Sequence, residues 1–423
     1  MPDGQQGLLL ALEVMVQRNV SIAIESGGHS SNPGASNIAS GITIDLAKFN
    51  TVTLTDHDQS VWIGPAARWS DVYAFLERHG LTVSGGRVGH VGVGGYVFGG
   101  GFSWFANQHG WTCDSVLEFE VITPNRRLLH ARKDWNGDLF WALKGSLGAF
   151  GLVTAIKLPI LPHREVYGGP IGYAATEASA LFDALHGLNL NAGKDLRSQG
   201  YLSLGWSPSA TDVGYIAYLL NTVGHDSPPA FENFTSISSI HNGMRKMTIK
   251  ESANEIACSN PLGYRRAKFT LTVKSSVGAM EVVRRTFEDF INVYREDLAG
   301  DKRLGVTLQP LTMPHVSIGD NIFSLKPEDG PLLLISAEIW WKDANRDKML
   351  DHYSKELYGR MVQGLGDKHW HPWLYPNYAA KWQEPFSGRV MPDRTRRSLT
   401  KVREKYDPDG VWKRLVPGVW HID

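Results

Sequence analysis

Two glycine-rich segments in the first hundred residues could bind a large anionic ligand. Ser26–Ser30 reads SGGHS, and Val91–Gly101 reads VGVGGYVFGGG. Adjacent glycines let the main chain approach a bulky anion and point successive amide groups at it. His29 follows its two glycines directly and would project into the same site. The two segments together predict a backbone-lined site for a large ligand that carries a phosphate-like anion.

Neither segment matches a standard nucleotide-binding loop. The Gly-Lys-Ser/Thr ending of a P-loop is missing, and the strict G-x-G-x-x-G spacing fails because Val97 stands where its last glycine would be. A structural turn at Gly27-Gly28, and tight turns of a β-domain along the second segment, remain open as alternatives. The residues by themselves therefore do not name the ligand.

The rest of the chain offers few other groups in a reactive arrangement. His369 and His371 have the spacing of a metal-binding pair, but no third ligand stands near them in the sequence. We therefore predict two loop histidines and no metal site. No Ser/His/Asp arrangement is visible in the linear sequence, although such triads assemble from distant segments.

The glycine segments lie in a part of the chain where short strands alternate with helices. An amphipathic helix is expected at the N-terminus and another at Trp69–His79, just before the second segment. Runs of β-branched residues bounded by Gly, Pro, Asn or Asp predict strands. These strands are Ser21–Glu25, Ile42–Leu46, Thr51–Leu54, Val61–Gly64, Val116–Thr123 and Gly151–Pro159.

Longer strands begin beyond Pro159–Pro162. They are predicted at Gly200–Trp206, Val213–Leu220, Arg265–Val273, Leu304–Gln309 and Pro331–Trp341. Helices are predicted at Thr176–His186, Met280–Arg295, Arg346–Leu357 and Asp393–Tyr406. This order predicts an α+β fold in which a mostly antiparallel sheet is covered by helices on one face.

Composition limits the partners of the chain. Its 423 residues are enough for two cores, and 43 basic against 43 acidic residues argue against nucleic acid or an anionic membrane as a partner. No apolar run approaches the roughly 20 residues that span a bilayer. Because the N-terminus does not read as a signal peptide, a cytoplasmic location is expected. Cys113 and Cys258 are expected to be buried free thiols.

The ordered motifs resemble the FAD-linked oxidases of the vanillyl-alcohol oxidase/p-cresol methylhydroxylase superfamily, especially the berberine-bridge-enzyme-like branch of fungal secondary metabolism. Besides the two glycine segments, the resemblance rests on Asn32–Gly34, Asp138–Gly145, Phe150–Thr154, Tyr375–Ala379 and Lys405–Pro408. It implies a two-domain flavoprotein. Its FAD-binding domain would be split between residues 1–162 and 373–423, with a substrate-binding domain inserted at residues 163–372.

The resemblance also implies how FAD is held. His29 matches the histidine that bonds to the 8α-methyl group of the flavin, and Val88 stands where a bicovalent subset has a cysteine. A single covalent link is therefore expected. The other residues that match cofactor-binding positions are Ser26, Gly27, Gly28, Ser30, Gly92, Val93, Gly94, Gly95, Gly101, Gly151, Val153 and Asn377.

In the same family, a further strand and turn precede the helix that opens this chain. A sheet edge without its neighbour is a liability because its main-chain groups are unpaired. We therefore expect another segment or a second copy of the chain to cover this edge, or FAD occupancy to be low. A homo-oligomer is one of these outcomes.

The implied reaction is oxidation of a small organic molecule, with hydride passing to FAD and molecular oxygen as the expected acceptor. Oxidation of an alcohol or a C–H bond requires a base near the reacting carbon. The candidates on the expected sheet and the returning segment are Tyr218, Gln309, Glu338 and Tyr375. Two alternatives remain open: a redox-neutral cyclase that uses the same pocket, and a binding protein without flavin.

Overall fold

The short strands of the N-terminal part form an antiparallel sheet of five strands. The structure is a computed structural model that describes residues 2, 4–55 and 59–422. The sheet has the order β3-β4-β8-β6-β7. Its strands are β3 (Val52–Thr55), β4 (Ser60–Ile63), β6 (Glu118–Ile122), β7 (Leu128–Ala131) and β8 (Leu152–Pro159). Two smaller pairs are β1 (Ile22–Glu25) with β2 (Ile42–Asp45), which is parallel, and β5 (Leu81–Thr82) with β9 (Leu161–Pro162).

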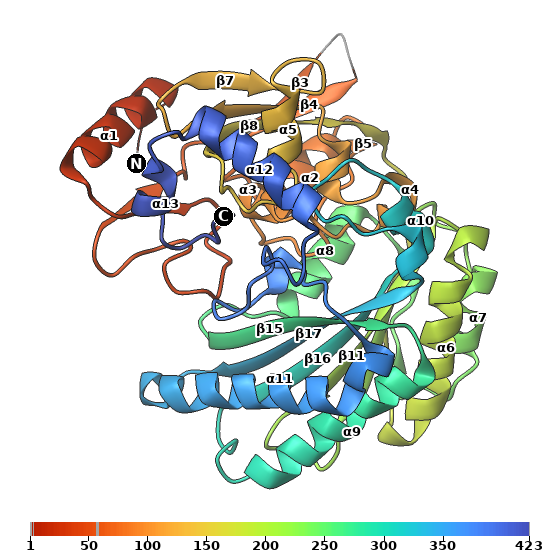
Figure 1. Ribbon diagram of the computed structural model, residues 1–423. Helices are drawn as coiled ribbons and strands as arrows, with labels where there is room; N and C mark the ends of the chain where they lie inside the picture. The colour runs from red at the N-terminus through yellow and green to blue at the C-terminus, as the bar shows by residue number, and fades with distance from the viewer. Residues whose placement is uncertain (1, 3, 56–58, 423) are drawn as a thin grey trace.

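Helices of the N-terminal part surround this sheet (Figure 1). They are α1 (Gln5–Arg18), α2 (Trp69–Glu77), α3 (Val93–Phe98), α4 (Ala106–His109) and α5 (Gly137–Leu143). α1 ends at Asn19, which adopts the left-handed conformation (φ 49°) that commonly closes a helix. The second glycine segment contains α3: Gly92 caps its N-terminus, and Gly94 and Gly95 lie in its first turn.

A nine-stranded sheet with antiparallel pairing forms the second half of the molecule. Its order is β13-β10-β12-β11-β16-β17-β15-β18, and β14 also pairs with β10. The long strands are β10 (Val166–Tyr173), β11 (Ser198–Trp206), β12 (Gly214–Asn221), β15 (Arg265–Lys274), β16 (Arg303–Leu311) and β17 (Leu332–Trp341). The short ones are β13 (His241–Asn242), β14 (Arg245–Met247) and β18 (Trp370–His371).

The two faces of this sheet carry different residues because side chains alternate along a strand. On β17, Ile335, Ala337 and Ile339 are buried under helices, whereas Ser336 and Glu338 point to the opposite face. Figure 1 shows the covering helices beneath and beside the sheet. They are α6 (Ala178–Leu190), α9 (Val277–Tyr294) and α11 (Asp347–His369). The uncovered polar face turns toward the N-terminal part.

The last fifty residues return to the N-terminal part, as Figure 1 shows for the blue helices α12 (Asp393–Tyr406) and α13 (Val411–Leu415). α13 packs its buried Trp412 and Leu415 against Leu8 and Leu12 of α1 and against Ile22 of β1. The two ends of the chain therefore share one small core.

Most predicted elements are found within a few residues of their expected bounds, and the predicted α+β class is confirmed. β10 was not predicted because Gly168, Gly169 and Pro170 are unusual in strands. α8 (Ile249–Cys258) was also missed. The prediction that Cys258 is buried is wrong: it lies on an exposed face at the end of α8, whereas Cys113 is buried, and both are free thiols.

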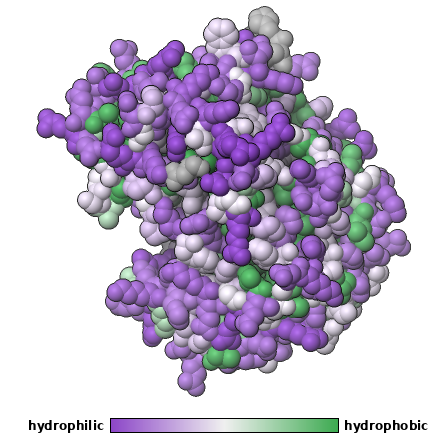
Figure 2. Space-filling view, viewed as in Figure 1, coloured by the Kyte–Doolittle hydropathy of each residue, from purple (hydrophilic) through white to green (hydrophobic). Residues whose placement is uncertain are grey.

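The described residues contain no helix that is both long and apolar enough to cross a bilayer. On the face that Figure 2 shows, hydrophobic residues are scattered in small groups on a mostly hydrophilic surface.

Candidate active site

A cavity of about 1110 Å³ lies between the glycine segments and the polar face of the nine-stranded sheet. Its size is slightly above the range of about 300–1,000 Å³ that is usual for small-molecule sites. Residues of three regions line it: Ser26–Asn32 and the second glycine segment, strands β11, β16 and β17, and Tyr375–Ala379 of the returning segment. Segments far apart in the sequence therefore share one wall.

The two glycine segments touch through their backbones. A Cβ atom on Gly27 would lie 2.4 Å from the Cα atom of Gly92, and a Cβ on Gly92 would lie 2.5 Å from the Cα of Gly27. Gly28 adopts φ +63°, a conformation that favours glycine. Any side chain at Gly27 or Gly92 would push the segments apart. The sequence requires glycine here so that two main chains can form one wall of the cavity.

Most residues that the sequence predicted to hold FAD line the cavity. These are Ser26, Gly27, Gly28, His29, Ser30, Gly92, Gly95, Gly151, Val153 and Asn377. Val93, Gly94 and Gly101 do not line it. Their amide groups donate within the protein, from Val93 to the Ala67 carbonyl (2.9 Å), from Gly94 to the Pro65 carbonyl (2.8 Å) and from Gly101 to the Tyr375 hydroxyl (3.0 Å). These three residues fix the shape of the wall.

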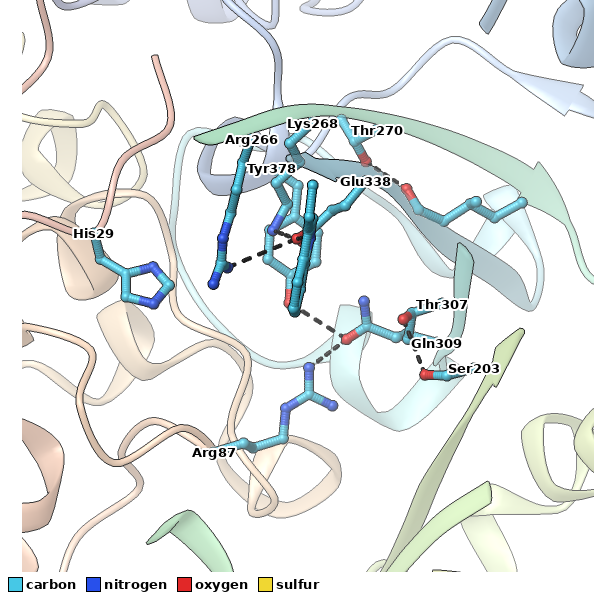
Figure 3. Close-up of polar contacts among 12 residues, drawn as sticks. His29, Arg87, Ser203, Arg266, Lys268, Thr270, Thr307, Gln309, Glu338 and Tyr378 are labelled. Carbon is cyan, nitrogen blue, oxygen red and sulfur yellow. Dashed lines mark hydrogen bonds and ion pairs between the residues drawn. The ribbon is translucent and has the colours of Figure 1, made fainter. Parts of the chain in front are cut away.

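His29 stands on its loop and faces the sheet across the cavity (Figure 3). Its Nε2 atom lies 3.2 Å from Nε2 of His90, so one ring donates a hydrogen bond to the other. The side chain has free surface, but that surface opens into the cavity. Loss of bulk water, followed by the positive charges of Lys268, His90 and Arg266, lowers the pKa of His29 to about 4, against the opposing effect of Glu338. The imidazole is therefore neutral at pH 7.

A charged cluster on β15 and β17 faces His29 (Figure 3). Lys268 and Glu338 are directly opposite in the strand register, and the Lys268 Nζ atom lies 2.8 Å from a Glu338 carboxylate oxygen. Arg266 lies 3.8 Å from the second oxygen, and the indole of Trp340 donates to it (2.8 Å). Burial opposes ionisation, but Lys268, Trp340 and Arg266 outweigh it and lower the pKa of Glu338 to about 2.

Gln309 on β16 joins the sheet to Arg87, which stands four positions before the second glycine segment. Its side-chain oxygen accepts a hydrogen bond from the buried guanidinium of Arg87, and the Tyr378 hydroxyl lies 3.5 Å from the same oxygen. The Lys268 ammonium lies over the ring of Tyr378, 4.0 Å from its centre. Figure 3 shows these side chains converging from three regions of the chain.

Tyr218 lies in an aromatic stack at one end of the cavity. Its ring is 5.9 Å from that of Tyr201 on the neighbouring strand, and both rings stack on Trp104. The Tyr218 hydroxyl donates to Glu255 of α8 (3.0 Å), and burial raises its pKa well above the ordinary value.

Tyr375 and Asn377 attach the returning segment to the second glycine segment. The Tyr375 hydroxyl accepts from the Gly101 amide (3.0 Å), and the Asn377 side chain donates to the Tyr96 carbonyl (2.9 Å) and to the Tyr375 hydroxyl (3.2 Å). Tyr375 is almost fully buried and stacks on Trp111. Both polar groups are therefore used to hold the wall together.

The structure thus brings Gln309 and Glu338 to the cavity centre, and sets Tyr218 and Tyr375 at its edges with their hydroxyls already bonded. Four further residues in or beside the cavity were not predicted from the sequence: Arg87, His90, Lys268 and Tyr378. Two signals were available: Arg87 and His90 lie among Gly85, Gly86 and Gly89, just before the second glycine segment, and Tyr378 lies in the Tyr375–Ala379 motif. No described His, Cys, Asp or Glu residues form a group of three that could hold a metal ion.

The fold and the shared cavity define a two-part flavoprotein oxidoreductase. Residues 1–132 match the FAD binding domain family. The FAD-dependent monooxygenase tpcD of Cochliobolus heterostrophus is 32% identical over 98% of this chain and 82% of that protein. The chain belongs to the FAD-linked oxidoreductases of the vanillyl-alcohol oxidase/p-cresol methylhydroxylase superfamily, so the predicted family, enzyme class and FAD cofactor are confirmed.

Two solved structures show the same fold. The xylooligosaccharide oxidase of Myceliophthora thermophila C1 superposes with a TM-score of 0.82 at 18% identity, over 100% of this chain and 91% of that chain. The berberine-bridge-enzyme-like 1 protein of Physcomitrella patens gives 0.78 at 15% identity, over 99% and 91%.

The residues present fit FAD. The paired glycines Gly27 and Gly92 form a wall without side chains, where a dinucleotide can approach the main chain closely. The cavity continues from this wall past His29 to the polar face of the sheet.

Proposed function

We propose that this protein oxidises a small organic molecule of secondary metabolism, using FAD bonded singly to His29 and oxygen as the electron acceptor. One observation carries the proposal: the wall of the flavin motifs and a polar sheet face enclose the same cavity. FAD, when bound, accepts a hydride from the substrate and passes the electrons to oxygen. Fungal relatives named as FAD-dependent monooxygenases support an oxygen-linked reaction.

The residues of the chain divide the remaining work. Neutral His29 has a lone pair available for covalent attachment, and His90 holds its ring in place. Glu338 stays ionised and holds Lys268 and Arg266 toward the cavity, so it is a positioning residue. Gln309 orients both Arg87 and Tyr378.

Tyr378 is the side chain placed to orient the reacting group of the substrate. Its hydroxyl donates weakly to Gln309 (3.5 Å) and its oxygen can accept a hydrogen bond from the substrate, whereas Tyr218 donates to Glu255 (3.0 Å) and Tyr375 accepts from the Gly101 amide (3.0 Å). A hydrogen bond worth about 0.5–1.5 kcal/mol changes a rate by about 2- to 12-fold. Tyr378→Phe should slow flavin reduction by this factor, and Tyr218→Phe should slow it by much less.

An anaerobic titration tests the function. Under nitrogen, a panel of benzylic alcohols and phenols is mixed with the purified holoprotein, and the visible flavin band is followed. Bleaching by one of them, then recovery in air with one hydrogen peroxide per product, is the expected result. Product without bleaching would instead establish a redox-neutral cyclase, and a protein without a flavin band would be a binding protein. If labelled molecular oxygen appeared in the product, the reaction would be oxygen insertion and not oxidation with release of peroxide.

A further inference from the structure

We propose that the molecule oxidised is an aromatic anion, and that Arg87 binds its negatively charged oxygen, either a carboxylate or an ionised phenol. The inference rests on the proposed oxidation, because it names the substrate class of that same cavity. The supporting observation is that Arg87 is buried among uncharged groups.

Arg87 is a buried cation whose guanidinium faces the cavity. Its residue is 9% exposed, and it lines the cavity beside the aromatic stack. The guanidinium carbon lies 4.6 Å from the centre of the Phe102 ring, 5.2 Å from that of Trp104 and 5.2 Å from that of Tyr201. Ring faces attract a cation, but they do not neutralise it.

Among the described residues, no ion pair joins Arg87 to a carboxylate. Its hydrogen-bond acceptor is the neutral side-chain oxygen of Gln309. On its other side, burial and then the charge of Arg87 lower the pKa of His315 to about 3, so this ring is neutral as well. A buried charge without an ionised partner is costly, and an anionic ligand would remove that cost.

Among the acidic residues that line the same cavity, Asp212 and Asp301 are exposed, and the half-buried Glu338 and Glu255 have partners. Glu338 is held by Lys268, Arg266 and Trp340. Glu255 accepts from Tyr218 (3.0 Å) and pairs with Arg245 (3.2 Å). Within the described part of the chain, none of these carboxylates pairs with Arg87, which lines the cavity.

The surroundings also define what the anion is attached to. Because the Gln309 oxygen is used by Arg87, its Nε2 group can donate to the ligand beside the guanidinium. A planar guanidinium matches a carboxylate with two parallel hydrogen bonds, and it also binds a phenolate oxygen. Tyr201 and Tyr218 present stacked rings next to these donors. A flat aromatic anion satisfies the charge, the donors and the rings together.

Binding of a matched pair of probes tests the proposal in the FAD-loaded protein without requiring turnover. The probes are 2-naphthoate and its neutral amide, 2-naphthamide, and their affinities are measured by calorimetry. The wild-type protein should prefer the anion roughly ten- to a hundredfold, the range expected for a charged hydrogen bond. Arg87→Met should lose this preference and keep its affinity for the amide.

Arg303→Gln is the matched control, because Arg303 lines the same cavity at its exposed end. This variant should keep the preference, which separates a local contact from the general positive potential of the cavity. Repeating the titration with 4-nitrophenol above and below its ionisation separates the phenolate from the carboxylate. Equal affinity of the wild-type protein for the two naphthalene probes would overturn the proposal.

A different result would assign Arg87 to the cofactor. If Arg87→Met shifted the flavin absorption spectrum or released FAD, while the preference for the anion persisted, the guanidinium would bind FAD and the proposal would be wrong. Because the probe experiment measures binding and not turnover, a negative result there does not contradict the proposed oxidation. A negative anaerobic titration likewise does not affect the interpretation of the binding data.

Discussion

At the residue scale, the surroundings of His29 keep its imidazole neutral, as the proposed covalent link requires. Its pKa of about 4 means that the ring is neutral from pH 5 upward and protonated only in stronger acid. We therefore predict covalently bound flavin in protein prepared at neutral pH. The denatured protein should fluoresce yellow-green on a gel under ultraviolet light, and His29→Ala should lose this band.

Cys113→Ser provides the control for attachment. Cys113 is buried in the core of the N-terminal part, and burial raises the pKa of its thiol well above the ordinary value. A thiol held in this state is a poor nucleophile. This variant should keep the fluorescent band. Flavin that washes out of the wild-type protein after acid precipitation would contradict the single link.

Glu338 gives a prediction on pH. Its pKa is about 2 in the folded protein against an ordinary 4.5, so the ionised form stabilises the fold above pH 4.5. This contribution is lost as the pH falls toward 2. Glu338→Gln should lower the free energy of unfolding at pH 7 by about 1.5–3 kcal/mol, because Lys268 and Arg266 lose a charged acceptor.

Urea unfolding of both proteins between pH 7 and pH 2 measures this difference. The gap between wild type and Glu338→Gln should be full at pH 6 and should shrink in acid. A gap that stays constant down to pH 2 would show that the charge of Glu338 does not stabilise the fold.

At the element scale, α8 is held in place by a capping box at its N-terminus. The Thr248 hydroxyl accepts from the Glu251 amide (3.1 Å), and the Glu251 carboxylate accepts from the Thr248 amide (2.8 Å). Removing such a cap costs about 0.5–2 kcal/mol. Thr248→Ala should lower the unfolding free energy by this amount, measured in urea.

Thr248→Ala should also loosen the lining of the cavity, because α8 carries Glu255, which accepts a hydrogen bond from Tyr218. Thr176→Ala is the matched control, since Thr176 is exposed and its hydroxyl donates to the neighbouring Glu177 (3.2 Å). This control should unfold like the wild type. A Thr248→Ala protein as stable as the control would mean that packing alone holds α8.

The elements also show why the sequence predicted the fold better than the site. Runs of β-branched and apolar residues predict strands β15, β16 and β17, and α12 was predicted at its observed bounds. The contact of Lys268 with Glu338 instead depends on how two strands about 70 residues apart are aligned. A single sequence does not specify this register. The Arg87–Gln309 contact spans 222 positions and was missed for the same reason.

At the scale of the whole molecule, the small core shared by the chain ends supports the flavin loop. β1 leads directly into Ser26–Ser30, and its Ile22 packs in the same core as Trp412 of α13. Trp412 is 2% exposed, and its indole donates to the Gly148 carbonyl (2.9 Å) on the cavity wall. Trp412, 382 positions after Ser30, thus shares a core with the strand that leads into Ser26–Ser30.

Trp412→Ala tests this long-range support. Truncating a buried tryptophan costs about 3–5 kcal/mol, so the free energy of unfolding should fall by this amount. Because β1 and the Gly148 region lose their packing partner, the ratio of bound flavin to protein should also fall, although no residue of the cavity has changed. Trp135→Ala is the matched control, since Trp135 is 62% exposed, and it should alter neither quantity. Unchanged flavin content in a clearly destabilised Trp412→Ala protein would show that the flavin loop holds its shape without the returning segment.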